Sequence, residues 1–153
     1  MIKIIFIIVI LIISVIIGYL IKQYFSIRRD LFYDFKDVFQ LLKSEISFLK
    51  SSKIEILTGR KFKTKYCSEF INRYVKNEEI CCVYLNDFEI KELLTMLDSI
   101  GNSDVDGEIN NINYCEIKIE KFCKKAEENF NKYGSFSFKI SFILGVLISI
   151  ILI

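Results

Sequence analysis

Two apolar runs, one at each end of the chain, constrain the fold more than any other sequence feature. The first extends from Ile4 to Ile21 and the second from Ile140 to Ile153. As a helix the first run is about 27 Å long, close to the roughly 30 Å hydrocarbon thickness of a bilayer. The second run reaches a similar length if it begins near Phe136, with Lys139 extending toward the headgroups. The sequence therefore predicts transmembrane helices over 1–21 and 136–153, and a separate domain over 22–135.

A cleaved secretory signal is the competing interpretation of the first run. Such a signal has a shorter apolar core and ends in a cleavage site of two small residues separated by one other. Here the run continues through Gly18 and Tyr19 to Ile21 and then meets Lys22, without that pattern. We therefore expect the first run to be retained as a membrane span.

Basic residues flank both runs on the same side and predict the orientation of the chain. On the opposite side there is only Lys3 beside the N-terminal amine. The positive-inside rule then places residues 22–135 in the cytoplasm. The flanking residues are Lys22, Arg28 and Arg29 after the first run, and Lys121, Lys124, Lys125, Lys132 and Lys139 before the second run, which starts at Ile140.

The middle of the chain has the apolar periodicity of helices, and no useful run of alternating residues predicts a strand. Two heptad patterns continue from the two spans, and we expect the helices that carry them to pack antiparallel. Shorter helices are predicted over 62–76 and 86–100, with turns over 51–60 and 101–107. The predicted fold class is all-α, a helical bundle between an N-terminal and a C-terminal transmembrane helix. The heptad positions are Phe32, Phe35, Phe39, Leu42, Ile46 and Leu49, then Ile112, Cys115, Ile119, Phe122, Ala126, Asn129 and Tyr133.

The residue types argue against catalysis and against binding of nucleic acid, cofactors or small-molecule substrates. The chain has no histidine, which is the commonest general base and metal ligand, and its net charge is only +2. The five cysteines are expected to be reduced, small, buried side chains, with a redox role for the vicinal pair Cys81–Cys82 as the alternative. Asp104, Asp106 and Glu108 lack the remaining ligands of a calcium loop, so we expect helix capping there.

Four segments carry a resemblance to a known family. They are Gly18 with the basic residues that follow it, Leu41–Ile46, the turn Gly101–Asp104, and Lys132–Gly134 with the terminal run around Leu144–Ile148. In order and position they resemble stage III sporulation protein AB of endospore-forming Gram-positive bacteria, over nearly the whole chain. The chain departs from the family at Ser52–Leu57, where the usual proline-containing segment is missing, and resembles it poorly over Phe62–Tyr84.

The resemblance implies a function. Family members belong to a secretion-like complex that the mother cell makes in the membrane around the forespore, and this complex includes a cytoplasmic ATPase. The member in question is similar to the inner-membrane platform protein of type II secretion systems. The expected function is therefore a membrane platform that docks the ATPase to a membrane channel, with other membrane proteins of the sporulation complex as partners and no enzymatic activity.

On this interpretation the functional residues lie on surfaces. Glu45, beside the heptad pattern, is the first candidate for a partner contact, with an exposed carboxylate or an intramolecular pair as the alternative. Asp104 is the second candidate, with helix capping as the alternative. Within the spans, small residues permit close helix packing, and we expect this of Gly18, Ser141, Gly145 and Ser149.

Two other functions compete with the platform. A two-span membrane regulatory or signalling protein is the main alternative. It is weakened because almost no residues are expected on the far side of the membrane, where a sensing domain would lie. A membrane-permeabilising protein such as a holin would be expected to carry polar, pore-lining residues in its spans. The two runs here are nearly pure isoleucine, leucine, valine and phenylalanine.

Overall fold

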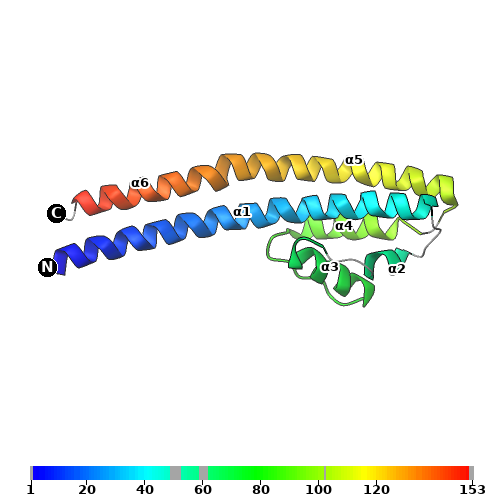
Figure 1. Cartoon of the computed structure of the whole chain (residues 1–153), viewed down its shortest axis with the longest axis horizontal. Helices are drawn as coiled ribbons and strands as arrows, with labels where there is room; N and C mark the ends of the chain where they lie inside the picture. The colour runs from blue at the N-terminus through cyan, green and yellow to red at the C-terminus, as the bar shows by residue number, and fades with distance from the viewer. Residues whose placement is uncertain (1, 49–52, 59–61, 102, 152–153) are drawn as a thin grey trace. The chain divides into compact units, whose positions relative to one another are not determined.

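The computed structural model describes residues 2–48, 53–58, 62–101 and 103–151. Every regular element in these residues is helical, which confirms the predicted all-α class. The chain divides into two compact units, a hairpin unit (Met1–Arg29 with Lys125–Ile153) and a bundle unit (Asp30–Lys124). The elements in Figure 1 are α1 (Ile2–Phe48), α2 (Lys53–Thr58), α3 (Lys65–Val75), α4 (Asp87–Asp98), α5 (Val105–Asn129), the π-helix η1 (Phe130–Gly134) and α6 (Ser135–Ile151).

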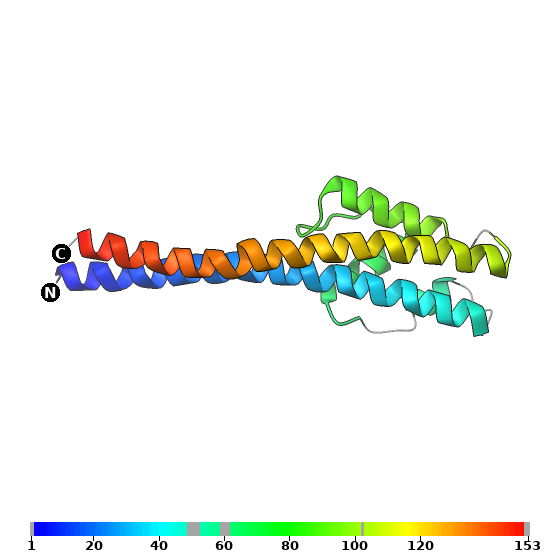
Figure 2. The same cartoon turned by 90° about the horizontal axis from the view of Figure 1, so that it is seen from above.

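The hairpin unit consists of two long helical segments. The first part of α1 and helix α6 run antiparallel beside each other, and both chain ends lie at the same end of the pair (Figures 1 and 2). The chain contains no proline, so nothing in the sequence forces either helix to break. Helical structure accordingly continues without interruption from Val105 through η1 to Ile151.

The bundle unit is built around the two predicted heptad seams. Phe32 of α1 stacks on Phe122 of α5 with ring centroids 5.5 Å apart and an interplanar angle of 11°. Phe35 meets Phe70 of α3 edge to face at 4.9 Å, so the α1 seam contacts two different helices. Ile46 is half-buried, and Leu49 lies outside the described residues. The fully buried seam positions are Phe32, Phe35, Phe39, Leu42, Ile112, Cys115, Ile119 and Ala126, which confirms both patterns over these residues. At the end of the second pattern Asn129 is half-buried and Tyr133 is exposed, so the prediction is wrong there.

The predicted turn over 51–60 is wrong in its centre, where helix α2 forms and buries Ile56 and Leu57. Residues 51–52 and 59–60 of that prediction lie outside the described residues. A helix of six residues is too short to show a helical period in the sequence. The predicted helix over 62–76 is confirmed in type, but it begins at Lys65 because Thr64 caps it with an oxygen that accepts from the Cys67 N–H at 3.3 Å.

Helix α4 follows the sequence prediction closely. Asn86 caps it and forms a reciprocal capping box with Glu89, and Gly101 follows its end with a φ of 101°. The next helix starts at Val105, earlier than the predicted turn over 101–107 implied. It starts there because Asp104 accepts a hydrogen bond from the Gly107 N–H at 3.1 Å.

The five cysteines fall into two groups. Cys67, Cys115 and Cys123 lie on helices and are buried, as predicted. Cys81 is exposed and Cys82 is half-buried, so the prediction of small buried side chains is wrong for this pair. Both lie between α3 and α4, where no helical face directs them into the core.

Candidate interaction surfaces

The two helices of the hairpin unit make their closest contact at small residues. A Cβ atom added to Gly18 would lie 2.9 Å from the Cβ of Ser141, and one added to Gly145 would lie 2.7 Å from the Cβ of Ser14. The Ser141 hydroxyl donates to the Ser14 carbonyl oxygen at 2.6 Å, and the Ser14 hydroxyl donates to the Ser141 carbonyl oxygen. Any larger side chain at either glycine would force the helices apart.

The structure therefore brings three of the predicted small residues, Gly18, Ser141 and Gly145, into one seam between α1 and α6. Ser149 is buried, and its hydroxyl donates to the Gly145 carbonyl oxygen of its own helix at 2.8 Å. Ser14 was not among the small residues predicted to pack between the spans. Its spacing of four residues before Gly18 is the same small-residue repeat that singled out Ser141 and Gly145.

Within the described residues, two helices are long and apolar enough to cross a membrane, judged by length and composition. The segments that meet this criterion are Ile5–Ile46 and Asp106–Ile151, which contain residues 5–21 of the first predicted span and 136–151 of the second. Their apolar side chains are mostly exposed in the hairpin unit, as Ile8, Ile12, Leu144 and Leu147 illustrate. A helix that exposes such side chains on most of its surface is suited to a lipid environment rather than to water.

Aromatic and basic side chains gather where the π-helix η1 replaces one turn of α-helix in the hairpin unit. Phe25 stacks on Tyr133 at 5.9 Å, and a Cβ atom added to Gly134 would lie 3.2 Å from the Cβ of Phe25. The Arg29 guanidinium lies over the Phe130 ring at 4.4 Å from its centroid. Aromatic rings beside basic groups are typical of the boundary between lipid and water, where the rings bury one end and leave the other wet.

A buried carboxylate joins α1 to the start of α3 in the bundle unit. Asp34 is 2% exposed and accepts two hydrogen bonds from Thr64, one from the backbone N–H at 2.7 Å and one from the hydroxyl at 2.6 Å. Beside it, the exposed Lys63 donates to Asp37 at 2.9 Å, and this hydrogen bond raises the pKa of Lys63. The buried pair fixes the register between the two helices, because a displaced Thr64 would leave the carboxylate without donors.

A lysine joins the three shorter helices of the bundle unit. The Lys53 ammonium of α2 donates to the Leu97 and Ile100 carbonyl oxygens at the end of α4, at 3.0 and 2.9 Å, and to the Tyr74 hydroxyl at 3.1 Å. Tyr74 in turn donates to Asp98 at 2.7 Å, and burial followed by this hydrogen bond raises the pKa of Tyr74. A cation at the negative end of α4 is electrostatically favourable.

The two predicted partner-contact residues lie on different helices. Asp104 is exposed and caps α5, which is the alternative role named for it above, and its contact with a partner stays a prediction. Glu45 lies half-buried on α1, two residues after Lys43. Lys43 itself pairs with Glu116 of α5 at 2.8 Å, which ties this part of α1 to the opposite helix.

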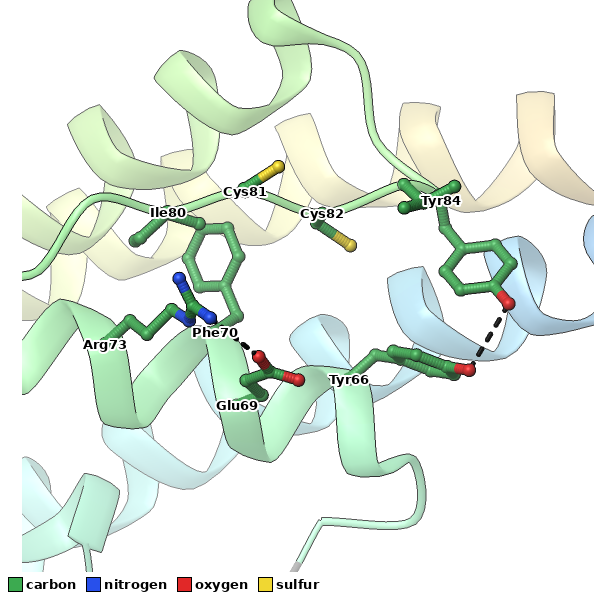
Figure 3. Close-up of a pocket in the computed structure, with 9 residues that line it drawn as sticks. Tyr66, Glu69, Phe70, Arg73, Ile80, Cys81, Cys82 and Tyr84 are labelled. Atoms are coloured by element: carbon green, nitrogen blue, oxygen red, sulfur yellow. Dashed lines mark hydrogen bonds and ion pairs between the residues drawn. The ribbon is translucent and has the colours of Figure 1, made fainter.

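The vicinal cysteines lie in a small pocket of about 190 Å³ between α3 and the segment that follows it (Figure 3). The Tyr66 and Tyr84 hydroxyls are 3.3 Å apart at one end of this pocket. At the other end Arg73 pairs with Glu69 at 3.1 Å. Burial raises the pKa of Cys82, so its thiol is less reactive than an ordinary surface thiol at neutral pH.

Within the described residues, no group of three or more His, Cys, Asp or Glu side chains is arranged to hold a metal ion. The contacts of the described residues are packing contacts: a tight helix seam, a junction of aromatic and basic side chains, and a bundle whose helices are joined by hydrogen bonds and ion pairs.

Comparison with known proteins places the chain in a family. No characterised protein and no solved structure matches the chain significantly. The model of one protein family, stage III sporulation protein AB, matches residues 68–153. The match includes the turn at Gly101 and the terminal run, whereas Leu41–Ile46 and Gly18 with the basic residues after it lie outside it. The match is therefore shorter than the resemblance over nearly the whole chain that we expected. Because residues 68–153 make up more than half of the 153 residues, the chain belongs to the stage III sporulation protein AB family.

Proposed function

We propose that this sporulation protein is the membrane platform of a secretion-like complex that the mother cell builds in the membrane around the forespore. In this role it holds a cytoplasmic ATPase against a membrane channel and contacts the other membrane proteins of the complex. The observation that carries the proposal is the continuity of the helices. Helix α1 runs unbroken from Ile2 to Phe48, from an apolar segment into the bundle unit, so the bundle is joined to the membrane by helix rather than by a loop.

The hairpin unit supports a two-span arrangement. Its seam satisfies the hydroxyls of Ser14 and Ser141 between the helices, as a nonpolar environment requires. Its basic side chains support a cytoplasmic bundle unit, since Arg29 and Lys132 lie at the end nearer that unit along the chain. Both also contact aromatic rings, those of Phe130 and Tyr133.

The orientation can be tested with Cys81, which is exposed. In vegetative cells that express the chain in the cell membrane, a membrane-impermeant maleimide should fail to label Cys81 while the cells are intact and should label it after permeabilisation. As a matched control, a Lys3→Cys chain with Cys81 replaced by serine should be labelled in intact cells. Labelling of Cys81 from outside would place the bundle unit on the other side of the membrane and remove the ATPase from reach.

The function itself is tested by deleting the gene in its sporulating host and counting heat-resistant spores. We expect a fall of several orders of magnitude, with engulfment completed and development then arrested. Normal spore numbers would refute the platform role and favour the two-span regulatory alternative.

Complementation with single variants tests Glu45 and Asp104 as partner contacts. Glu45→Lys should fail to restore spores if Glu45 meets a basic group of a partner, and Gln40→Lys, at an exposed position of the same helix, is its control. Asp104→Ser keeps a side chain that caps α5 but removes the charge. A partner contact predicts loss of spores with Asp104→Ser, whereas a purely capping role predicts normal spores.

A further inference from the structure

A groove of about 540 Å³ lies in the bundle unit between the end of α3 and helix α4. Its floor is apolar, because Tyr74, Ile80, Ile90 and Leu94 line it and all four side chains are half-buried. A volume of this size is in the range of pockets that hold a ligand or several side chains of a partner. The groove lies wholly within the residues that match the family, 68–153.

Acidic side chains surround this floor. Glu78, Glu79, Asp87 and Asp98 line the groove and are exposed. Among the described lining residues, Lys91 is the only basic one. A hollow lined by one sign of charge, with apolar walls, concentrates the electric field and attracts groups of the opposite sign.

The backbone holds two of these carboxylates in a defined turn. Asn77 adopts the left-handed conformation with a φ of 53°, and its N–H donates to the Tyr74 carbonyl oxygen at 3.1 Å. The Glu78 N–H donates to the Arg73 carbonyl oxygen at 2.9 Å, which completes the pattern of a helix C-terminal cap. The Arg73 guanidinium then donates to the Glu79 carbonyl oxygen at 3.0 Å, so both ends of the acidic turn are anchored to α3.

The carboxylates of Glu78, Glu79 and Asp87 form no ion pair with any residue in the described parts of the chain. Elsewhere in the same unit, acidic side chains do pair across helices, as Glu116 does with Lys43 and Glu92 with Lys118. Gathering unpaired like charges around one hollow is unfavourable for the isolated protein, and a cationic occupant would offset that cost.

We propose that this groove binds a basic amphipathic segment of a partner protein. Apolar side chains of the segment lie on the floor formed by Ile80, Ile90 and Leu94, and its Lys or Arg side chains meet the surrounding carboxylates. Anionic lipid is repelled by the same charges, so the occupant is a protein rather than a membrane surface. The inference rests on the proposed platform function in one respect, since it names the chemistry by which the platform holds a partner.

The test uses the full chain in nanodiscs of zwitterionic lipid and a synthetic helical peptide of lysine and leucine that carries one photoreactive leucine. After illumination, mass spectrometry locates the cross-linked residues, so peptide bound to lipid does not contribute to the signal. We expect cross-links at Ile80, Ile90 or Leu94. The same peptide with glutamate in place of lysine should give none there.

Two triple variants with the same change in net charge make the comparison specific. Glu78→Gln with Glu79→Gln and Asp87→Asn should lower the groove cross-link by about tenfold, because each exposed charge pair contributes modestly and three are removed. The matched control removes three exposed carboxylates outside the groove and should leave the yield unchanged. It combines Asp106→Asn, Glu120→Gln and Glu128→Gln.

Two outcomes would overturn the inference: peptide cross-links only outside the groove, or equal losses of the groove cross-link in the two triple variants. The result is separable from the platform function. If the peptide binds the groove and the deletion strain sporulates normally, the groove proposal stands and the platform function is refuted. If the peptide does not bind the groove and the deletion strain loses spores, the platform function stands and the groove proposal is refuted.

Discussion

Replacing Asp34 with alanine is the most informative perturbation of the bundle unit. The change removes a carboxylate that is 2% exposed and accepts both donors of Thr64, at 2.7 and 2.6 Å. Thr64 also caps α3, so the loss acts on the point where α3 begins. The structure therefore predicts that α3 detaches from α1 more readily in this variant.

The size of the effect follows from the two hydrogen bonds. Hydrogen bonds to a charged group contribute about 1.5–3 kcal/mol each, and the cost of burying the carboxylate offsets part of that gain. We expect a net loss of about 3 kcal/mol. At about 1.4 kcal/mol per factor of ten, this corresponds to a roughly hundredfold rise in the population of the opened state. For a domain of this size the melting temperature should fall by about 12–24 °C.

Pulsed alkylation of Cys67 measures this opening directly. Cys67 lies in the first turn of α3, is fully buried, and has its pKa raised chiefly by burial, so it reacts only when α3 opens. When reclosing is faster than alkylation, the labelling rate is proportional to the opened population. Cys115 of α5, buried in the same unit, distinguishes local opening of α3 from unfolding of the whole unit.

The control is the neighbouring exposed pair. Asp37→Ala removes the partner of Lys63 and should leave Cys67 labelling close to that of the unmodified chain, because an exposed ion pair contributes little. Combining Asp34→Ala with Thr64→Val should cost less than the sum of the two single changes. Unchanged labelling in Asp34→Ala, or strict additivity in the double variant, would refute the assigned role of the pair.

Four further predictions concern other parts of the molecule. Gly145→Ala should weaken the hairpin by about 1–3 kcal/mol through overpacking, measured as a lower dodecyl sulfate fraction at helix dissociation, whereas Leu144→Phe on the exposed face should not. Asn77→Gly should keep thermal stability and Asn77→Val should lower it by about 1–2 kcal/mol, since only the latter is strained at a φ of 53°. Ellman's reagent should react quickly with Cys81 in the folded chain, and with Cys123 only after unfolding. Burial raises the pKa of Cys123 from 9.0 to about 11, so the thiol loses its proton at lower pH in the unfolded state than in the folded state. The free energy of unfolding should therefore fall between about pH 9 and pH 11, and Cys123→Ala should make this fall smaller.

Local signals explain which elements could be predicted from the sequence. Asn86 and Glu89 lie three residues apart, and the side chain of each accepts a hydrogen bond from the backbone N–H of the other. The start of α4 can therefore be predicted from residues that are close in the sequence. The heptad seams can also be predicted from the sequence, because the apolar period of a single segment marks the buried face of a single helix. Helix α2 could not be recognised in this way. Its position depends on burial of Ile56 and Leu57 and on the bonds that Lys53 forms with the end of α4.

The residues of the candidate surfaces also differ in whether a local sequence pattern could predict them. Gly18, Ser141 and Gly145 could be singled out as small residues in apolar runs, but their facing partner Ser14 appeared only with the register between α1 and α6. Asp104 was correctly recognised as a possible cap, since a cap and its helix are neighbours in the chain. The buried pair of Asp34 and Thr64 joins residues thirty positions apart, and no local pattern marks it.

By itself the sequence determined the all-α class, the two apolar segments, the main helices and the family, because periodicity, length and capping are properties of neighbouring residues. The tertiary structure alone decided which residues face one another. It placed Ser14 against Gly145, anchored α3 through Asp34, and gathered acidic side chains from α4 and the turn before it around one apolar floor. These contacts depend on the register and packing of separate helices, and packing energy is a property of facing surfaces rather than of any one segment.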